Sequence, residues 1–79
     1  MGAHRIDESA YALDMICAAE AHYQREHGRD ALPIDRDACE VRDDERGVRV
    51  RLVDTFGDAV AVLWRRAGSW SPRAPGLGT

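Results

Sequence analysis

The residue types that most often carry out chemistry are sparse in this chain, which has three histidines and two cysteines. His22 and His27 are five residues apart, which is about 140° around a helix, so they do not share the face that a metal-binding pair at i and i+4 needs. Cys17 and Cys39 have no C-x-x-C spacing, and no serine stands in a G-x-S-x-G frame. The chain also lacks a glycine-rich phosphate-binding motif. We therefore predict no catalytic residue, no metal site and no cofactor, and we expect a protein that is not an enzyme.

The acidic residues are the second group with a chemical use. They concentrate between positions 30 and 45, in two segments that we expect to be loops, and the chain has a net charge of -3. If the two loops lie together, their carboxylates form a negative surface that mimics phosphate groups. The arginines interspersed among them favour an ordinary solvated rim instead. The candidate residues for the acidic surface are Asp35, Asp37, Asp43, Asp44 and Glu45.

The overall charge and the length of the apolar segments limit the classes of partner and the cellular location that we expect. An acidic balance argues against direct nucleic-acid binding, because neutralising phosphates needs a concentrated basic patch. The first ten residues lack the apolar run of a signal peptide, and no stretch approaches about 18 apolar residues, so we expect a cytoplasmic protein that does not bind a membrane. In that compartment Cys17 and Cys39 are expected to be reduced and buried; a disulfide between the helix and the first strand is the alternative.

One long helix is predicted over residues 7 to 27. Asp7 is the expected N-cap, and Gly28 supplies the left-handed residue that ends the helix. Leu13, Ile16 and Cys17 fall on one apolar face, which we expect to cover a sheet.

A second, narrower stripe of uncharged side chains runs along roughly the opposite side of this helix. A surface helix with one buried face would carry charged residues there, so the stripe predicts contact with a partner. The stripe consists of Tyr11, Met15, Ala18 and His22.

The segment from 48 to 64 predicts a β-hairpin. A three-residue loop over 55 to 57, with Gly57 in the left-handed conformation, is the common type I turn with a G1 bulge. The resulting register sends one set of cross-strand pairs to the inner face of the sheet. These pairs are Leu52 with Val60, Val50 with Val62, and Val48 with Trp64.

A shorter strand is predicted over 38 to 42, followed by a polar loop and by Gly47, which opens the next strand. Counting back from this loop gives a second register, and it directs the same valines inward. The predicted pairs are Val41 with Val48, Cys39 with Val50, and Glu40 with Arg49.

The outer face of the predicted sheet places Arg49, Arg51 and Arg65 around Ala59, Ala61 and Leu63. Arginine is enriched at protein interfaces, and an exposed apolar centre is otherwise a solubility liability. A solvated face on which Glu40 neutralises Arg49 is the alternative. The predicted partner-binding residues are Tyr11, Met15 and His22 on the helix, and Arg49, Arg51, Leu63 and Arg65 on the sheet.

Together these elements predict a single α+β domain over residues 1 to 71, in the order α-β-β-β, and a flexible Pro/Gly-rich tail over 72 to 79. In this prediction the helix packs on an antiparallel meander of three strands, and a fourth strand that contains Trp70 is the alternative. The architecture resembles cystatin-like and other small helix-on-sheet folds, and this resemblance transmits no function. The predicted core consists of Leu13, Ile16, Cys17, Tyr23, Val41, Val48, Val50, Leu52, Val60, Val62 and Trp64.

These features predict a small non-catalytic protein-interaction module or inhibitor, which binds a protein partner or a second copy of itself. In size and acidity the chain is also similar to small inhibitors encoded by phages and mobile elements, anti-CRISPR proteins among them. That resemblance implies the alternative function, which is an acidic inhibitor that blocks a nucleic-acid-handling complex by phosphate mimicry.

Overall fold

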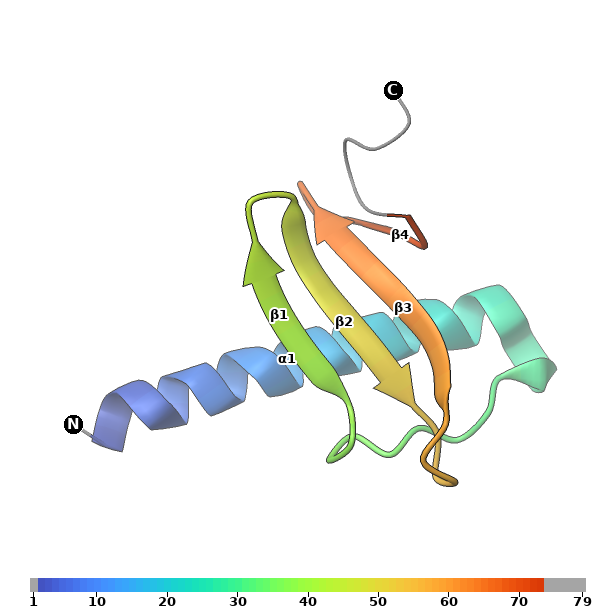
Figure 1. The fold of residues 1–79 in the computed structure, drawn as a ribbon. Helices are drawn as coiled ribbons and strands as arrows, with labels where there is room; N and C mark the ends of the chain where they lie inside the picture. The colour runs from blue at the N-terminus through green and yellow to red at the C-terminus, as the bar shows by residue number, and fades with distance from the viewer. Residues whose placement is uncertain (1, 74–79) are drawn as a thin grey trace.

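The computed structural model describes residues 2–73, including their side chains except those of residues 2–9 and 44. One helix lies across one face of a four-stranded antiparallel meander, so the predicted α+β class is confirmed and Trp70 belongs to a fourth strand (Figure 1). Residues 74–79, and with them most of the predicted tail, lie outside the described residues. The elements are α1 (Gly2–His27), the short 3₁₀ helix η1 (Gly28–Asp30), β1 (Glu40–Asp44), β2 (Gly47–Val53), β3 (Ala59–Arg66) and β4 (Ser69–Ser71).

The helix α1 begins at Gly2, which is five residues earlier than predicted. Asp7 therefore lies inside the helix and is not its N-cap, because the alanine, arginine and glutamate residues around it all favour helix and no proline interrupts them. The C-terminal end agrees with the sequence, since Gly28 follows the helix with a φ of 57°. The additional N-terminal turns extend beyond β1, the first strand of the sheet (Figure 1).

The buried face of α1 lies between the two stripes that the sequence suggested. Ile16, Ala19 and Tyr23 are buried against the sheet, and Met15 packs beside them. Leu13, predicted to be in the core, is instead 48% exposed. A regular helix turns by about 100° per residue, so a face centred on Ala19 leaves Leu13 at its edge.

The turn between β2 and β3 forms as predicted. Gly57 has a φ of 90°, and its N–H donates to the carbonyl oxygen of Asp54 at 3.1 Å. Val53 then pairs with Ala59, as the loop requires. Beyond that pair the register shifts, because Val60 is an extra residue in β3 without a partner on β2.

This second bulge reverses the face of the sheet to which each of the following side chains of β3 points. The observed pairs are Val50 with Leu63 and Arg49 with Trp64, so the predicted pairing of Val50 with Val62 is wrong. A one-residue slip moves every following side chain to the opposite face. The bulge also lets two consecutive residues, Val60 and Ala61, pack against the core, which a regular strand does not allow.

The first hairpin is tighter than predicted. Its turn has only two residues, and β1 continues to Asp44, so Val41 pairs with Val50 and Arg42 pairs with Arg49. Glu40 lies opposite Arg51, not opposite Arg49 as predicted. The four-residue loop that we expected is shorter because two of its acidic residues extend the strand.

The segment between η1 and β1 is attached to the end of β2. The N–H of Asp35 donates to the carbonyl oxygen of Val53 at 2.9 Å, and the N–H of Val53 donates to the Sγ of Cys39 at 3.3 Å. Burial raises the pKa of the Cys39 thiol above its ordinary value. Cys17 and Cys39 are both free, so the alternative of a disulfide is not realised in the structure.

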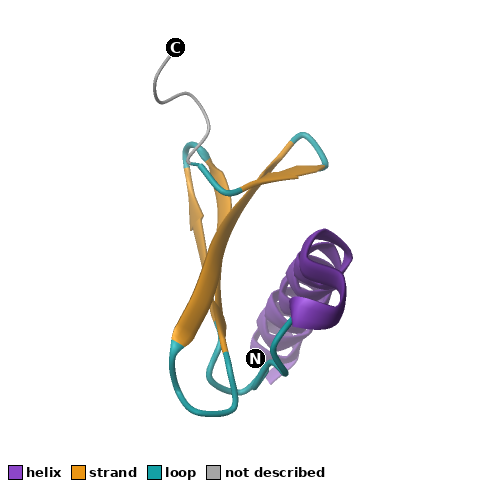
Figure 2. Cartoon of the chain, turned by 90° about the vertical axis from the view of Figure 1, so that its right-hand side faces the viewer, coloured by secondary structure: helices purple, strands orange, loops and turns teal. Residues whose placement is uncertain are grey.

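The core occupies the space between α1 and the sheet, which Figure 2 shows from the side. The buried members of this cluster include four predicted residues and two that the prediction omitted, while Val41, Val48 and Val60 are partly buried beside them. Val62 and Trp64 belong to neither group, because the bulge places them on the other face. The buried cluster consists of Ile16, Ala19, Tyr23, Val50, Leu52 and Leu63.

Candidate functional site

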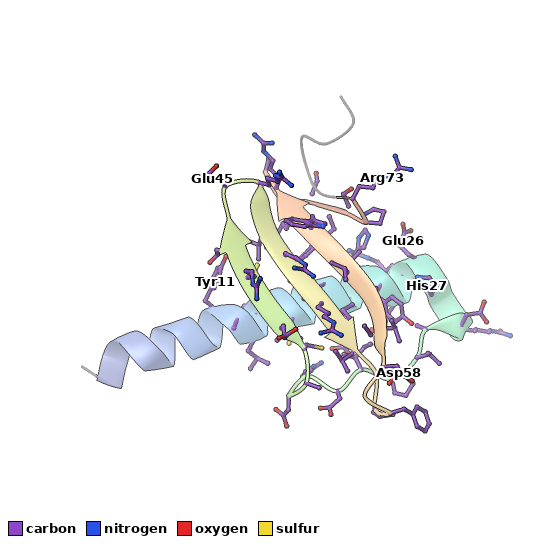
Figure 3. The ribbon with its side chains drawn as sticks, in the orientation of Figure 1. Tyr11, Glu26, His27, Glu45, Asp58 and Arg73 are labelled. Atoms are coloured by element: carbon purple, nitrogen blue, oxygen red, sulfur yellow. The ribbon has the colours of Figure 1, made fainter. Side chains whose placement is uncertain are left out.

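The sheet face that points away from α1 carries most of the arginines of the strands. Alternation along β1, β2 and β3 places Arg42, Arg49 and Arg51 on this outer face, together with Trp64 and Val62 of β3. Arg66, two residues after Trp64, continues the same side. Figure 3 shows the nitrogen-bearing side chains gathered in front of these strands, with α1 behind them. Among the described side chains of β1 to β3, Glu40 is the one carboxylate on this face.

The arginines on the outer face differ in their contacts. The guanidinium carbon of Arg49 lies 6.0 Å from the ring centre of Trp64, a distance at which a cation attracts an aromatic face. Arg51 donates to a carboxylate oxygen of Glu40 at 3.1 Å, and both side chains are largely exposed. Such an exposed ion pair contributes about 0–1 kcal/mol. The arrangement of the side chains on the outer face is therefore determined mainly by the strands that carry them, and the ion pair contributes little.

Arg42 and Arg49 lie directly opposite each other on neighbouring strands. Like charges at this position destabilise a sheet. Arg42 forms no ion pair with any side chain that the structure describes. The pair of arginines therefore leaves a positive charge that is free to bind an anionic group from outside.

A cleft of about 430 Å³ opens on this face beside the edge of the sheet. Its walls are the side chains of Glu40, Arg42, Arg49 and Arg51, and Val41 also lines it. The cleft is thus bordered by three cations and one anion, a composition that suits a carboxylate or phosphate group.

Two of the predicted partner-binding residues of the outer face lie on the helix side instead, as does Ala61. Leu63 is only 6% exposed and belongs to the buried core. The side chain of Arg65 contacts the Sδ of Met15 at 3.6 Å and lies with its guanidinium carbon 5.8 Å from the ring centre of Trp70. The bulge at Val60 is the cause of both corrections, since it reverses the faces of the residues that follow.

The helix stripe that was predicted to bind a partner is partly occupied by the protein itself. The hydroxyl of Tyr11 donates to Oδ1 of Asp43 at 3.1 Å, although Tyr11 remains 42% exposed. Loss of hydration, followed by this hydrogen bond, raises the pKa of the Tyr11 phenol above its ordinary value. Met15 is partly buried against the core and His22 is also partly buried, so of the three predicted binding residues Tyr11 is the one that is exposed.

His22 lines a second hollow, a groove of about 630 Å³ between α1 and β3. The Nε2 of His22 lies 4.0 Å from Oε1 of Glu26. The ring centre of His27 lies 4.5 Å from the ring centre of Tyr23. The groove is mostly apolar on its sheet side, where residues 60–63 form its wall. Within the described part of the chain, no group of three or more histidine, cysteine or acidic side chains could hold a metal ion.

The candidate acidic residues do not meet in one surface. Asp35 and Asp37 lie before β1, whereas Asp43 and Glu45 lie at its far end, at the turn into β2. Figure 3 shows Glu45 at that turn, opposite to the end of the sheet where Asp58 lies. The side chain of Asp44 is outside the described residues. The condition for a phosphate-mimicking surface, that the two loops lie together, is therefore not met.

Two functional candidates were missed by the sequence analysis. Trp64 joins the arginines only because of the bulge, and no residue near Val60 signals a bulge in the sequence. Phe56 is 84% exposed at the tip of the β2–β3 turn, where the Oδ1 of Asp54 accepts hydrogen bonds from the N–H groups of Phe56 and Asp58, both at 2.9 Å. Its position at the centre of a predicted loop could have identified it as exposed.

None of the helices in the described residues is both long and apolar enough to cross a membrane. Comparison with protein-family models, with curated proteins and with solved structures finds no match to this chain.

Proposed function

We propose that this chain is a small non-catalytic protein-interaction module that binds an acidic surface of a partner protein through the outer face of its sheet. The observation that carries the proposal is the opposed pair of arginines, Arg42 and Arg49, in a protein whose net charge is -3. Repulsion between them lowers the stability of the free protein, and a carboxylate from a partner would remove it.

The composition of the face supports a protein partner. Tryptophan and arginine are among the residues most enriched at the energetic centres of protein interfaces, and here Trp64 lies opposite Arg49 and two residues before the exposed Arg66 on the same face. Nucleic acid is less favoured, because one half-buried indole that already contacts a guanidinium is a poor platform for stacking bases. The free thiols are compatible with a cytoplasmic location, which is part of the proposal.

The proposal is tested by capturing partners with the full chain from a nuclease-treated lysate of the organism that encodes it. The double variant Arg42→Glu/Arg49→Glu reverses two charges of the face. The double variant Arg25→Glu/Arg29→Glu changes the net charge equally at the end of α1, far from the face. We expect one partner to be captured by the wild type and by the control variant, and to be lost with the face variant.

The magnitude follows from the charges involved. Breaking close charge pairs at an interface costs about 2–5 kcal/mol, which is at least a thirtyfold loss of affinity. Equal capture by both double variants would show that the outer face does not bind the partner. Capture that disappears after nuclease treatment would assign the face to nucleic acid instead.

A further inference from the structure

We propose that the open edge of β1 accepts an extended acidic segment of the partner protein as a fifth strand, with its carboxylates over Arg42 and Arg49. The inference rests on the proposed function and adds the way in which the partner binds. Three features of the structure lead to it: an uncovered sheet edge, a helix longer than the sheet is wide, and positive charge next to that edge.

The edge of β1 has backbone groups available for pairing. In the sheet order β1-β2-β3-β4, β1 has β2 on one side and no described strand on the other. The two-residue turn closes on the pair Asp44 and Gly47, and antiparallel pairs alternate between hydrogen-bonded and non-hydrogen-bonded along the strands. Counting from the turn, Val41 and Asp43 direct their N–H and C=O groups away from β2. An incoming strand could pair with these groups.

The helix α1 provides a surface under the position of a fifth strand. It has 26 residues, which corresponds to a length of about 39 Å, while the outer strands of a four-stranded sheet lie only about 14 Å apart. The helix extends past the sheet at both ends, and its N-terminal turns extend on the side of β1 (Figure 1). The contact between Tyr11 and Asp43 lies where α1 passes that edge. A strand added beside β1 would cover the overhanging turns of the helix.

The charge next to the edge determines the kind of segment. Neighbouring strands are about 4.8 Å apart, so alternate side chains of an added strand would lie beside Glu40 and Arg42 on the outer face. The 430 Å³ cleft between Arg42, Arg49 and Arg51 opens there. Of these positions, the one beside Arg42 is where a carboxylate would offset the repulsion between Arg42 and Arg49. The intervening side chains would face Val41, Asp43 and α1, and the position beside Val41 suits an apolar residue.

A second copy of this chain fits the site less well. The described side chains that its own β1 places on the outer face are Glu40 and Arg42, so it would add no net negative charge beside Arg42 and Arg49. Its α1 would also lie on the helix side of the joined sheet and would have to share the space beside β1 with the overhanging turns. The complementary occupant is therefore an acidic strand that carries no such helix.

Fluorescence anisotropy with the full chain and a labelled ten-residue peptide of alternating Asp and Val tests the inference. Two control peptides carry Lys in place of Asp, or the same sequence with N-methylated central amides, which keeps the charges but blocks strand pairing. We expect the first peptide to bind, and each control to bind at least about tenfold more weakly, since two or more backbone hydrogen bonds or the ion pairs are lost.

Protein variants separate strand addition from simple attraction of charge. Val41→Pro removes an N–H that points to the open edge, a change that an edge strand tolerates, and we expect it to weaken binding of the Asp/Val peptide about tenfold while the circular dichroism spectrum is unchanged. Arg42→Glu should weaken binding at least as much. Arg29→Glu, which makes the same charge change outside the sheet, should leave the affinity within twofold of the wild type.

The outcomes distinguish this inference from the proposed function. If the N-methylated peptide binds as tightly as its parent, the face binds anions without strand addition and the inference is overturned, while the proposed function stands. If the peptide does not bind but capture of the partner still depends on Arg42 and Arg49, the same conclusion follows. If sedimentation shows a dimer that Val41→Pro converts to a monomer, the edge is occupied by a second copy and the inference is also wrong.

Discussion

The position of Leu63 is the most direct test of the bulge in β3, because the side chain is buried only in the shifted register. At 6% exposure, Leu63 loses almost all of its buried methyl groups on substitution by alanine. Leucine-to-alanine changes in a core cost about 2–5 kcal/mol of unfolding free energy. Each kcal/mol lowers the melting temperature of a domain of this size by roughly 4–8 °C. For a loss of about 3 kcal/mol, Leu63→Ala should therefore lower it by roughly 12–24 °C.

The matched control is Val62→Ala at the neighbouring position, which is only partly buried and lies outside the core cluster. Its expected cost is below about 1 kcal/mol, because little apolar surface leaves water at that position on folding. Thermal and urea denaturation followed by circular dichroism measure both variants. If Val62→Ala proves as destabilising as Leu63→Ala, or more so, β3 does not contain the bulge and the outer face described above does not exist.

Three further changes test other parts of the structure. Gly47→Ala should cost at least about 2 kcal/mol in urea denaturation, because the added methyl group would overlap the carbonyl oxygen of Arg65 at a backbone φ of 142°. In an absorbance titration the Tyr11 phenol should ionise above the usual pH of a tyrosine, and Asp43→Asn should lower the pKa of this phenol. Because the pKa of Tyr11 is raised in the folded protein, the stability that the protonated phenol contributes is present below pH ~10 and is lost as the phenol ionises. Arg42→Glu should raise the unfolding free energy by roughly 0.5–1 kcal/mol, because a cross-strand repulsion becomes an attraction, and an unchanged or lower value would contradict that account.

Local signals in the sequence were sufficient for the architecture. Gly28 ends the helix and Gly57 reverses the chain, and both adopt the left-handed conformation that their positions suggested. Each of these features depends on a few consecutive residues, so the sequence contains the information that determines them. The helix, the meander and the inward direction of Val50 and Leu52 follow from such features.

The register of β3 could not be predicted in the same way. The turn at Gly57 sets the pair Val53 and Ala59, but nothing in the turn requires the following residues to continue in regular alternation. Alternation would bury Trp64 and expose Leu63, whereas the bulge buries Leu63 in the same cluster as Ala19 and brings Ala61 to the core in addition to Val60. This choice depends on packing between α1 and the sheet, which are distant in sequence. The same dependence explains why Leu13 was wrongly placed in the core while Ile16 and Tyr23 were correctly placed there.

The corrected register changes the composition of the outer face. With Leu63 outward, the outer face would have had an aliphatic centre with Arg49, Arg51 and Arg65 around it. With Trp64 outward, the face has an aromatic centre, and Glu40 pairs with Arg51, which leaves Arg42 and Arg49 opposed. A protein that needed only to fold would gain stability by exchanging one of these two residues for a carboxylate. A gain in stability for Arg42→Glu together with a loss of binding would therefore show that this arginine lowers the stability of the free protein and serves its interaction with a partner.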